Sequence, residues 1–133
     1  MSDVSVSVDV SVSGARNGFR PAADNAADAF RSLDVYRCAI EVMPHAYNIA
    51  KLLDGEMASQ LRRAALSIGL NIAEGSGRFD KDQRRFLITA RGSALECAAV
   101  LDAVTAIGIT APEVEKTDAL LVRIVSMLTK MIG

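Results

Sequence analysis

Residues 60–78 read QLRRAALSIGLNIAEGSGR and carry the most regular pattern in the chain. Apolar side chains recur at steps of three and four residues from just before this stretch, through Ala58, Leu61, Ala65, Ile68 and Ile72. This spacing places them on one face of an α-helix. Because glycine is favoured just beyond the last helical turn, Gly75-Ser76-Gly77 is expected to end this helix.

Three more stretches, one before this helix and two after it, show the same spacing. They run through Leu33, Tyr36, Ile40, Met43, Tyr47 and Ala50, then through Phe86, Ala90, Ser93, Cys97, Val100, Val104 and Ile107, and finally through Val114, Thr117, Leu121, Ile124, Leu128 and Met131. Short links between long helices force neighbouring helices to run antiparallel. The sequence therefore predicts an all-α fold, an antiparallel up-and-down four-helix bundle over residues 32–133.

The expected helix ends carry recognisable signals. Asp54-Gly55 separates the first two helices, and Pro112 falls in the first turn of the fourth, where its missing N–H is tolerated. Capping-box patterns open the last two helices, at Asp80 with Gln83 and at Thr110 with Glu113. Pro44 lies inside the first helix, and because the apolar pattern continues through it, we expect a kink near residues 40–43 rather than a break.

Residues 1–31 differ from the rest and are expected to form a flexible N-terminal tail. Valine alternates with serine or aspartate over residues 4–12, and residues 14–28 are rich in Gly, Ala, Asn and Asp. A period of two is typical of a strand, but an isolated strand has no partner within a helical bundle. The segment is therefore either disordered or paired with the edge of a neighbouring molecule.

Composition limits the class of protein. The chain has 133 residues, the size of one domain, and half of them are hydrophobic. We expect apolar surface beyond what one small core buries, and hence a homo-oligomer. No apolar run is long enough to span a membrane and no signal peptide is recognisable, so the protein is expected to be cytoplasmic. Cys38 and Cys97 lie within apolar helical patterns and are expected to be buried.

No catalytic or metal-binding pattern stands out. The single histidine, His45, has no glutamate three residues before it, as a carboxylate-bridged metal site in a bundle would need. Gly75-Ser76-Gly77-Arg78 lacks the Lys-Ser/Thr and the preceding strand of a phosphate-binding loop. We therefore predict a non-enzymatic protein with no cofactor and no metal, in which His45 is a spectator.

A polar stripe runs along residues 63–78. Because apolar residues flank this stripe on both sides, we expect its polar side chains to be partly buried, and buried polar groups must be paired. One interpretation is a structural hydrogen-bonded network that fixes helix register or a subunit contact; the other is a pore or groove that binds a ligand. The candidate network residues are Ser67, Asn71, Glu74, Arg91, Ser93 and Glu96.

Basic residues are concentrated in the middle of the chain, although the net charge is −1. Residues 62–91 carry seven basic and three acidic side chains. Lysine and arginine clusters of this kind are typical of phosphate-binding surfaces. The candidate nucleic-acid-binding residues are Arg62, Arg63, Arg78, Lys81, Arg84, Arg85 and Arg91.

The segment 60–78 closely resembles the four helix bundle protein family. Founding members of that family are encoded in intervening sequences of bacterial large-subunit ribosomal RNA genes, and the accessory variability protein of diversity-generating retroelements is a relative. Arg91-Gly92-Ser93 with Glu96, after Phe86-Leu87, resembles the second motif of the family. Leu33-Asp34-Val35-Tyr36 with Tyr47 also fits, so the resemblance extends from Leu33 to the last residue.

The resemblance implies a closed, barrel-like homopentamer of four-helix bundles. For the retroelement relative it also implies binding of nucleic acid and of a reverse transcriptase through basic surface residues. Two functional hypotheses follow. The first is an oligomeric protein that binds RNA or DNA through its basic surface. The second is a structural or adaptor module that binds a protein partner, such as a reverse transcriptase, without contacting nucleic acid.

Overall fold

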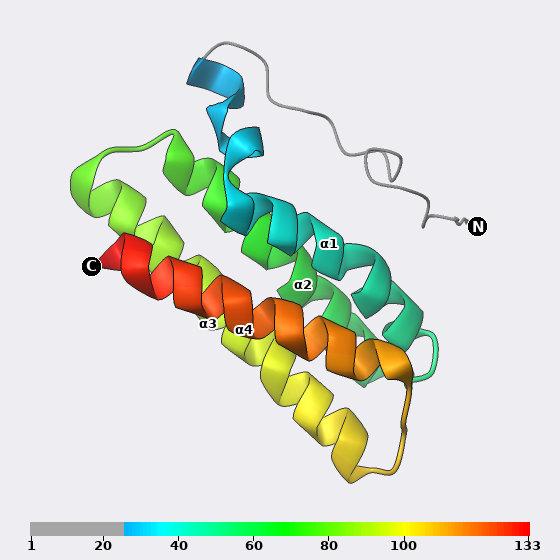
Figure 1. The fold of residues 1–133 in the computed structure, drawn as a ribbon. Helices are drawn as coiled ribbons and strands as arrows, with labels where there is room; N and C mark the ends of the chain where they lie inside the picture. The colour runs from blue at the N-terminus through cyan, green and yellow to red at the C-terminus, as the bar shows by residue number, and fades with distance from the viewer. Residues whose placement is uncertain (1–25) are drawn as a thin grey trace.

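The computed structural model describes residues 26–133, and within this range the predicted four-helix bundle is confirmed (Figure 1). Its long helices are α1 (Asp34–Ala50), α2 (Gly55–Ser76), α3 (Asp80–Ala106) and α4 (Pro112–Ile132). Each helix packs against its neighbours in the chain, and α1 also packs against α4, so the four form a closed square. Because successive helices are antiparallel, α2 and α4 run in the same direction.

The core is built from fully buried aliphatic side chains of all four helices. Every residue of the apolar pattern predicted for α2 is buried, and so are Thr117, Leu121, Ile124 and Leu128 of α4. Burial of this apolar surface is the main favourable term in folding. None of the helices in residues 26–133 is long and apolar enough to cross a membrane.

The predicted core face of α1 is wrong by about one residue. The residues that face the core are Val35, Cys38, Ala39, Val42, Ala46, Ile49 and Ala50, of which the predicted set contained Ala50. Leu33, Tyr36, Ile40 and Met43 are only partly buried and Tyr47 is exposed. Both sets have helical spacing. Gly69 of α2 lets α1 approach closely, because a Cβ there would stand 3.8 Å from the Cβ of Ala39 and equally close to side-chain atoms of Tyr36 and Ile40. The helix continues through Pro44 without ending.

Both predicted capping boxes are wrong. The residue that precedes α3 is Phe79, and Gln83 donates to the carbonyl of Arg78 over 3.2 Å instead of reaching a cap N–H. The residue that precedes α4 is Ala111, and the carboxylate of Glu113 turns toward α1 instead. Asp54, by contrast, caps α2, because its Oδ1 accepts a hydrogen bond from the N–H of Met57 at 2.9 Å.

The last residues assigned to the flexible tail are helical. Ala26–Ser32 form a short 3-10 helix, η3, that packs against α1 and α2. Its Phe30 ring meets the Tyr36 ring edge to face, with the ring centroids 5.0 Å apart. An aromatic residue at position 30 therefore moves the start of the folded domain into the predicted tail. The expected disorder or strand pairing of residues 1–13 lies outside the described residues.

Both cysteines are buried and free, as expected. Burial raises the pKa of the Cys97 thiol to about 12 and also raises the pKa of Cys38. Since the thiolate is the reactive form, Cys97 at pH 8 should react with a thiol reagent on the order of a thousandfold more slowly in the folded protein than in the unfolded chain. Labelling with and without denaturant, read by mass spectrometry, checks this. Prompt labelling of Cys97 in the native protein would show that the core of the bundle opens frequently.

Candidate nucleic-acid interface

The seven basic candidates do not form one surface. Arg78, Lys81, Arg84 and Arg85 lie together at the α2–α3 turn, at the end of the bundle that also holds the C-terminus of α4 (Figure 1). Arg62 and Arg63 lie early in α2, about 22 Å along the helix from Arg78 at a rise of 1.5 Å per residue. The candidate interface therefore consists of the four basic residues at the α2–α3 turn. We call these four residues the basic end.

The turn between α2 and α3 is tight. Gly77 caps α2, and Asp80 has a φ of 50°, in the left-handed region that aspartate tolerates better than most residues. Gly75, buried in the last turn of α2, lies so close to α3 that a Cβ there would stand 3.0 Å from the Cβ of Phe86. A larger residue at position 75 would push the two helices apart at the basic end.

Phe86 organises two of the four basic side chains. The guanidinium of Arg85 lies 4.9 Å from the centroid of its ring, and that of Arg78 lies 5.2 Å from it. Cations at this distance are attracted by the negative face of the ring. Phe86 thus keeps the positive charges of Arg78 and Arg85 close together at the turn.

Acidic side chains neutralise part of this charge. Arg78 pairs with Glu74 at 2.6 Å and with Asp82 at 3.5 Å, while Arg85 pairs with Asp82 at 3.3 Å. The hydrogen bonds that Arg78 donates to the Glu74 carboxylate, together with the negative charge of that group, raise the pKa of Arg78 above its ordinary value. Asp80 is a third acidic residue at this turn. The four residues of the basic end and these three acidic residues together carry a net charge of about one positive unit per copy at neutral pH.

Lys81 and Arg84 are the basic side chains most available to a ligand. Both are exposed, and among residues 26–133 no salt bridge involves either of them. Arg84 donates from Nε to the carbonyl of Ile132 over 3.2 Å, which links α3 to the end of α4. That bond uses one of five guanidinium donors, so the rest of the side chain is free to meet a phosphate.

The comparison with known families identifies the chain. The model of the 23S rRNA-intervening sequence protein family matches residues 31–130, most of the bundle. The chain belongs to this family. The resemblance noted at residues 60–78 is thereby confirmed.

A solved structure shows the same fold. It is a crystal structure of a protein with unknown function from the S23 ribosomal protein family of Bacteroides thetaiotaomicron VPI-5482. The alignment has a TM-score of 0.69 at 24% sequence identity and covers 74% of this chain and 98% of that one. No curated protein matches the chain.

The remaining basic candidates of this intervening-sequence protein lie elsewhere on the bundle. The Arg62 guanidinium lies 5.9 Å from the centroid of the Tyr47 ring on α1. Arg91, half-buried, donates from Nε to Oγ1 of Thr129 on α4 at 2.8 Å. Arg63 is exposed on the outward face of α2. None of these three lies at the basic end.

Half of the predicted polar network comes together. The hydroxyls of Ser67 and Ser93 are 2.8 Å apart and join α2 to α3, and the Asn71 amide donates to Oγ and to the carbonyl of Ser67. Glu74 pairs instead with Arg78, and Arg91 with Thr129. Glu96 is exposed on α3. Asn71 and Ser93 both bond to Ser67, so the geometry fits a helix-register role better than a ligand groove.

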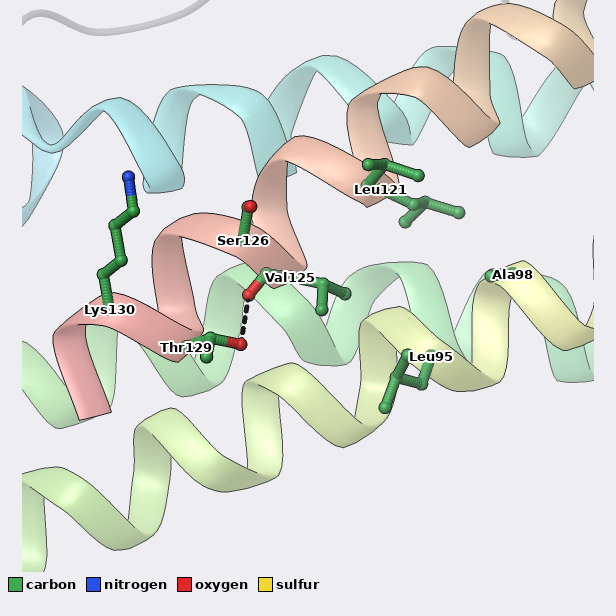
Figure 2. Close-up of a pocket in the computed structure, with 8 residues that line it drawn as sticks. Leu95, Ala98, Leu121, Val125, Ser126, Thr129 and Lys130 are labelled. Carbon is green, nitrogen blue, oxygen red and sulfur yellow. Dashed lines mark hydrogen bonds between the residues drawn. The ribbon is translucent and has the colours of Figure 1, made fainter. Parts of the chain in front are cut away.

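Two features of this family member were missed from the sequence. His45 and Asn48 of α1 both face Glu113 of α4; the Asn48 amide donates to the carboxylate at 2.9 Å, and His45 Nδ1 lies 3.4 Å from it. Position 45 is therefore part of an interhelical contact, where a spectator was expected. The second feature is an apolar groove between α3 and α4, lined by Leu95, Ala98, Leu121, Val122 and Val125 (Figure 2).

The groove could not be recognised in the apolar pattern. Leu95 and Val122 are 46% and 62% exposed, and both lie outside the core positions of their helices. A signal existed in the surplus of large apolar residues beyond the core pattern, but it did not show which of them lie side by side. Among the described residues, no three His, Cys, Asp or Glu side chains are grouped as a metal site would need.

Proposed function

We propose that this intervening-sequence protein is a non-enzymatic, self-associating bundle that binds the phosphate backbone of RNA or DNA through its basic end. The observation that carries the proposal is the gathering of Arg78, Lys81, Arg84 and Arg85 at one end of the bundle. Two of these side chains, Lys81 and Arg84, have no carboxylate partner among residues 26–133. Arginine and lysine on phosphates provide affinity without base readout.

The position of these residues at the start of α3 supports phosphate binding. Positive side chains are unfavourable there because the helix dipole is positive at its N-terminus. Asp80 and Asp82 offset this effect in the free protein. A docked phosphate would offset it further and would also accept hydrogen bonds from the open N–H groups of the first turn.

Self-association compensates for the small net charge of one copy. Leu66 and Leu70 of α2 are 46% and 59% exposed, and the α3–α4 groove adds further apolar surface. Surface of this kind favours an oligomer, for which the family resemblance implies five subunits. Several weak phosphate sites in one assembly add up to useful affinity. The descriptions of the family and of the similar structure, which refer to 23S rRNA and to a ribosomal protein family, fit an RNA context. A bundle that meets such RNA would act in the cytoplasm.

The test is binding to a fluorescently labelled single-stranded RNA, followed by anisotropy at about 50 mM salt, where phosphate contacts are strongest. We expect saturable binding at micromolar protein that is similar for unrelated sequences. Absence of binding under these conditions contradicts the proposal.

The second candidate is an adaptor that binds a protein. The apolar α3–α4 groove favours it, because an amphipathic helix of a partner, such as a reverse transcriptase, fits such a surface. This alternative is favoured if the chain does not bind RNA but does bind a purified protein partner. Replacing Val122 with Glu should then abolish the binding of that partner.

A further inference from the structure

A hollow distinct from the α3–α4 groove lies at the same end of the bundle as the basic residues. It opens between η3, the end of α2, the start of α3 and the end of α4, which come together there (Figure 1). Its volume of about 420 Å³ falls within the roughly 300–1,000 Å³ of typical small-ligand sites. We call this hollow the end pocket.

The walls of the end pocket are mainly apolar. Ile72 and Leu87 belong to the buried core and form its floor. Phe30 and Leu33 are half-buried and Met131 is exposed, so these three side chains remain accessible to a ligand. An aromatic ring and a thioether are surfaces against which flat rings pack well.

Contacts with two neighbours hold the Phe30 ring in place. The Tyr36 ring meets it edge to face, and the guanidinium of Arg31 lies 4.7 Å from its centroid. Arg31 in turn pairs with Asp28 of the same short helix. The aromatic wall of the end pocket is therefore preorganised, which lowers the entropy cost of binding a ligand.

Two polar side chains of the end pocket retain hydrogen-bonding capacity. Gln83 donates from Nε2 to the carbonyl of Arg78 at 3.2 Å, which leaves its Oε1 and a second N–H for a ligand. Ser76 donates from its hydroxyl to the carbonyl of Ala73 at 2.8 Å, so its oxygen can still accept. These groups complement the edge of a nucleobase, which carries donors and acceptors side by side.

Positive charge lies at the rim of the end pocket. Arg84 follows Gln83 on α3, and its Nε donates to the carbonyl of Ile132, the residue after Met131. Lys81 lies one turn earlier on α3. Since neither basic side chain has a carboxylate partner among residues 26–133, both are available to an anion. The end pocket therefore suits a ligand with a flat apolar part and an anionic part.

A nucleotide of a single strand has this composition. One sugar joins its phosphate to its base, so a base in the end pocket leaves the phosphate at the rim near Arg84. In a duplex the bases are paired and stacked, and each must be unstacked before it can enter a pocket. Packing against an aromatic ring accepts any base, because every base has a π-face. Such a pocket therefore agrees with weak sequence preference.

We propose that the end pocket takes one unpaired base of a single-stranded nucleic acid. The base packs against Phe30 and is bonded at its edge by Gln83, while Arg84 and Lys81 hold the adjoining phosphates. The proposal rests on the phosphate binding of the proposed function and specifies its ligand as a single strand.

Two fluorescent oligomers of equal length test the proposal on the full chain, by anisotropy at about 50 mM salt. One is a single-stranded RNA, and the other carries the same number of phosphates on abasic sugars. The RNA should bind about tenfold more tightly, which is the usual effect of one stacked base. Equal affinity overturns the proposal and leaves phosphate binding intact, whereas binding of neither oligomer contradicts both.

Two variants test whether this preference for bases arises in the end pocket. Phe30→Ala removes the aromatic wall and should abolish most of the preference. Gln83→Met keeps the length of the side chain but removes the carboxamide, and should reduce the preference by about threefold, as the loss of one hydrogen bond does. Binding of the abasic oligomer should persist in both, and circular dichroism checks that both are folded. The proposal is overturned if the full preference persists in either variant.

Phe79→Ala is the matched control for Phe30→Ala. Phe79 is an aromatic residue at the same end of the bundle, is 83% exposed and does not line the end pocket. This variant should keep the preference for RNA over the abasic oligomer. Loss of the preference in Phe79→Ala but not in Phe30→Ala would place the base on the open turn and overturn the proposal. Equal affinity for both oligomers, with binding of a fatty acid that Phe30→Ala abolishes, would assign the end pocket to an anionic amphiphile instead.

Discussion

Replacing both Arg84 and Arg85 with Ala should lower the affinity for single-stranded RNA by at least about tenfold at 50 mM salt. Each arginine contributes a charge-assisted hydrogen bond to a phosphate, a class of interaction worth roughly 1.5–3 kcal/mol. Arg84 has no carboxylate partner among residues 26–133, so little intramolecular pairing is given up when it binds. The affinity is measured by fluorescence anisotropy on wild type and variant under the same buffer conditions.

The control removes two exposed positive charges elsewhere. Lys116 and Arg123 lie on α4, away from the basic end, and the variant with both replaced by Ala has the same net charge as the Arg84/Arg85 variant. It should bind RNA nearly as well as wild type. If the two double variants lose affinity equally, binding follows net charge, and the basic end has no special role.

Gly75→Val should lower the free energy of unfolding by about 2–3 kcal/mol. A Cβ at this position would stand 3.0 Å from the Cβ of Phe86 and 3.4 Å from the carbonyl oxygen of Gln83, so the added methyls overpack the α2–α3 contact. For a domain of this size the loss corresponds to a fall in Tm of roughly 10 °C or more. Denaturant unfolding followed by circular dichroism provides the measurement.

Gly92→Val is the matched control for that variant. Gly92 lies in the interior of α3, and a Cβ there would meet nothing within 4 Å. Its stability should change by no more than about 0.5 kcal/mol, as surface substitutions usually do. Equal stability of the two variants would show that the close approach of α2 and α3 at Gly75 is not maintained in solution.

Much of the fold could be predicted because the core of α2 and α4 follows a single apolar spacing. In α1 the sequence offers two apolar sets, and the packing of α1 against both α2 and α4 decides which of them is buried. Similarly, Leu87, Ala94 and Leu101 lie outside the apolar spacing predicted for α3, yet they are buried in the core of one copy. Periodicity defines the faces of a helix, but the neighbouring helices determine which face is inside.

The candidate site was harder to predict for a related reason. Seven basic residues are close in sequence, but α2 and α3 are long and antiparallel, so only those near the turn are close in space. Glu113 and Gln83 fit a capping pattern, yet each forms a contact that depends on an element or turn outside its own helix. The apolar groove requires residues of α3 and α4 that are more than 20 positions apart in sequence to lie side by side, which no local pattern reveals.

The most direct test of the proposed function is the salt dependence of RNA affinity for the full-length protein. If several phosphates are neutralised by the basic ends of one assembly, log affinity should fall linearly with log salt between about 50 and 200 mM. The slope should be at least about 2 in magnitude, since each phosphate of a single strand contributes about 0.7. An affinity that stays constant over this range, or no binding at 50 mM, would contradict the account.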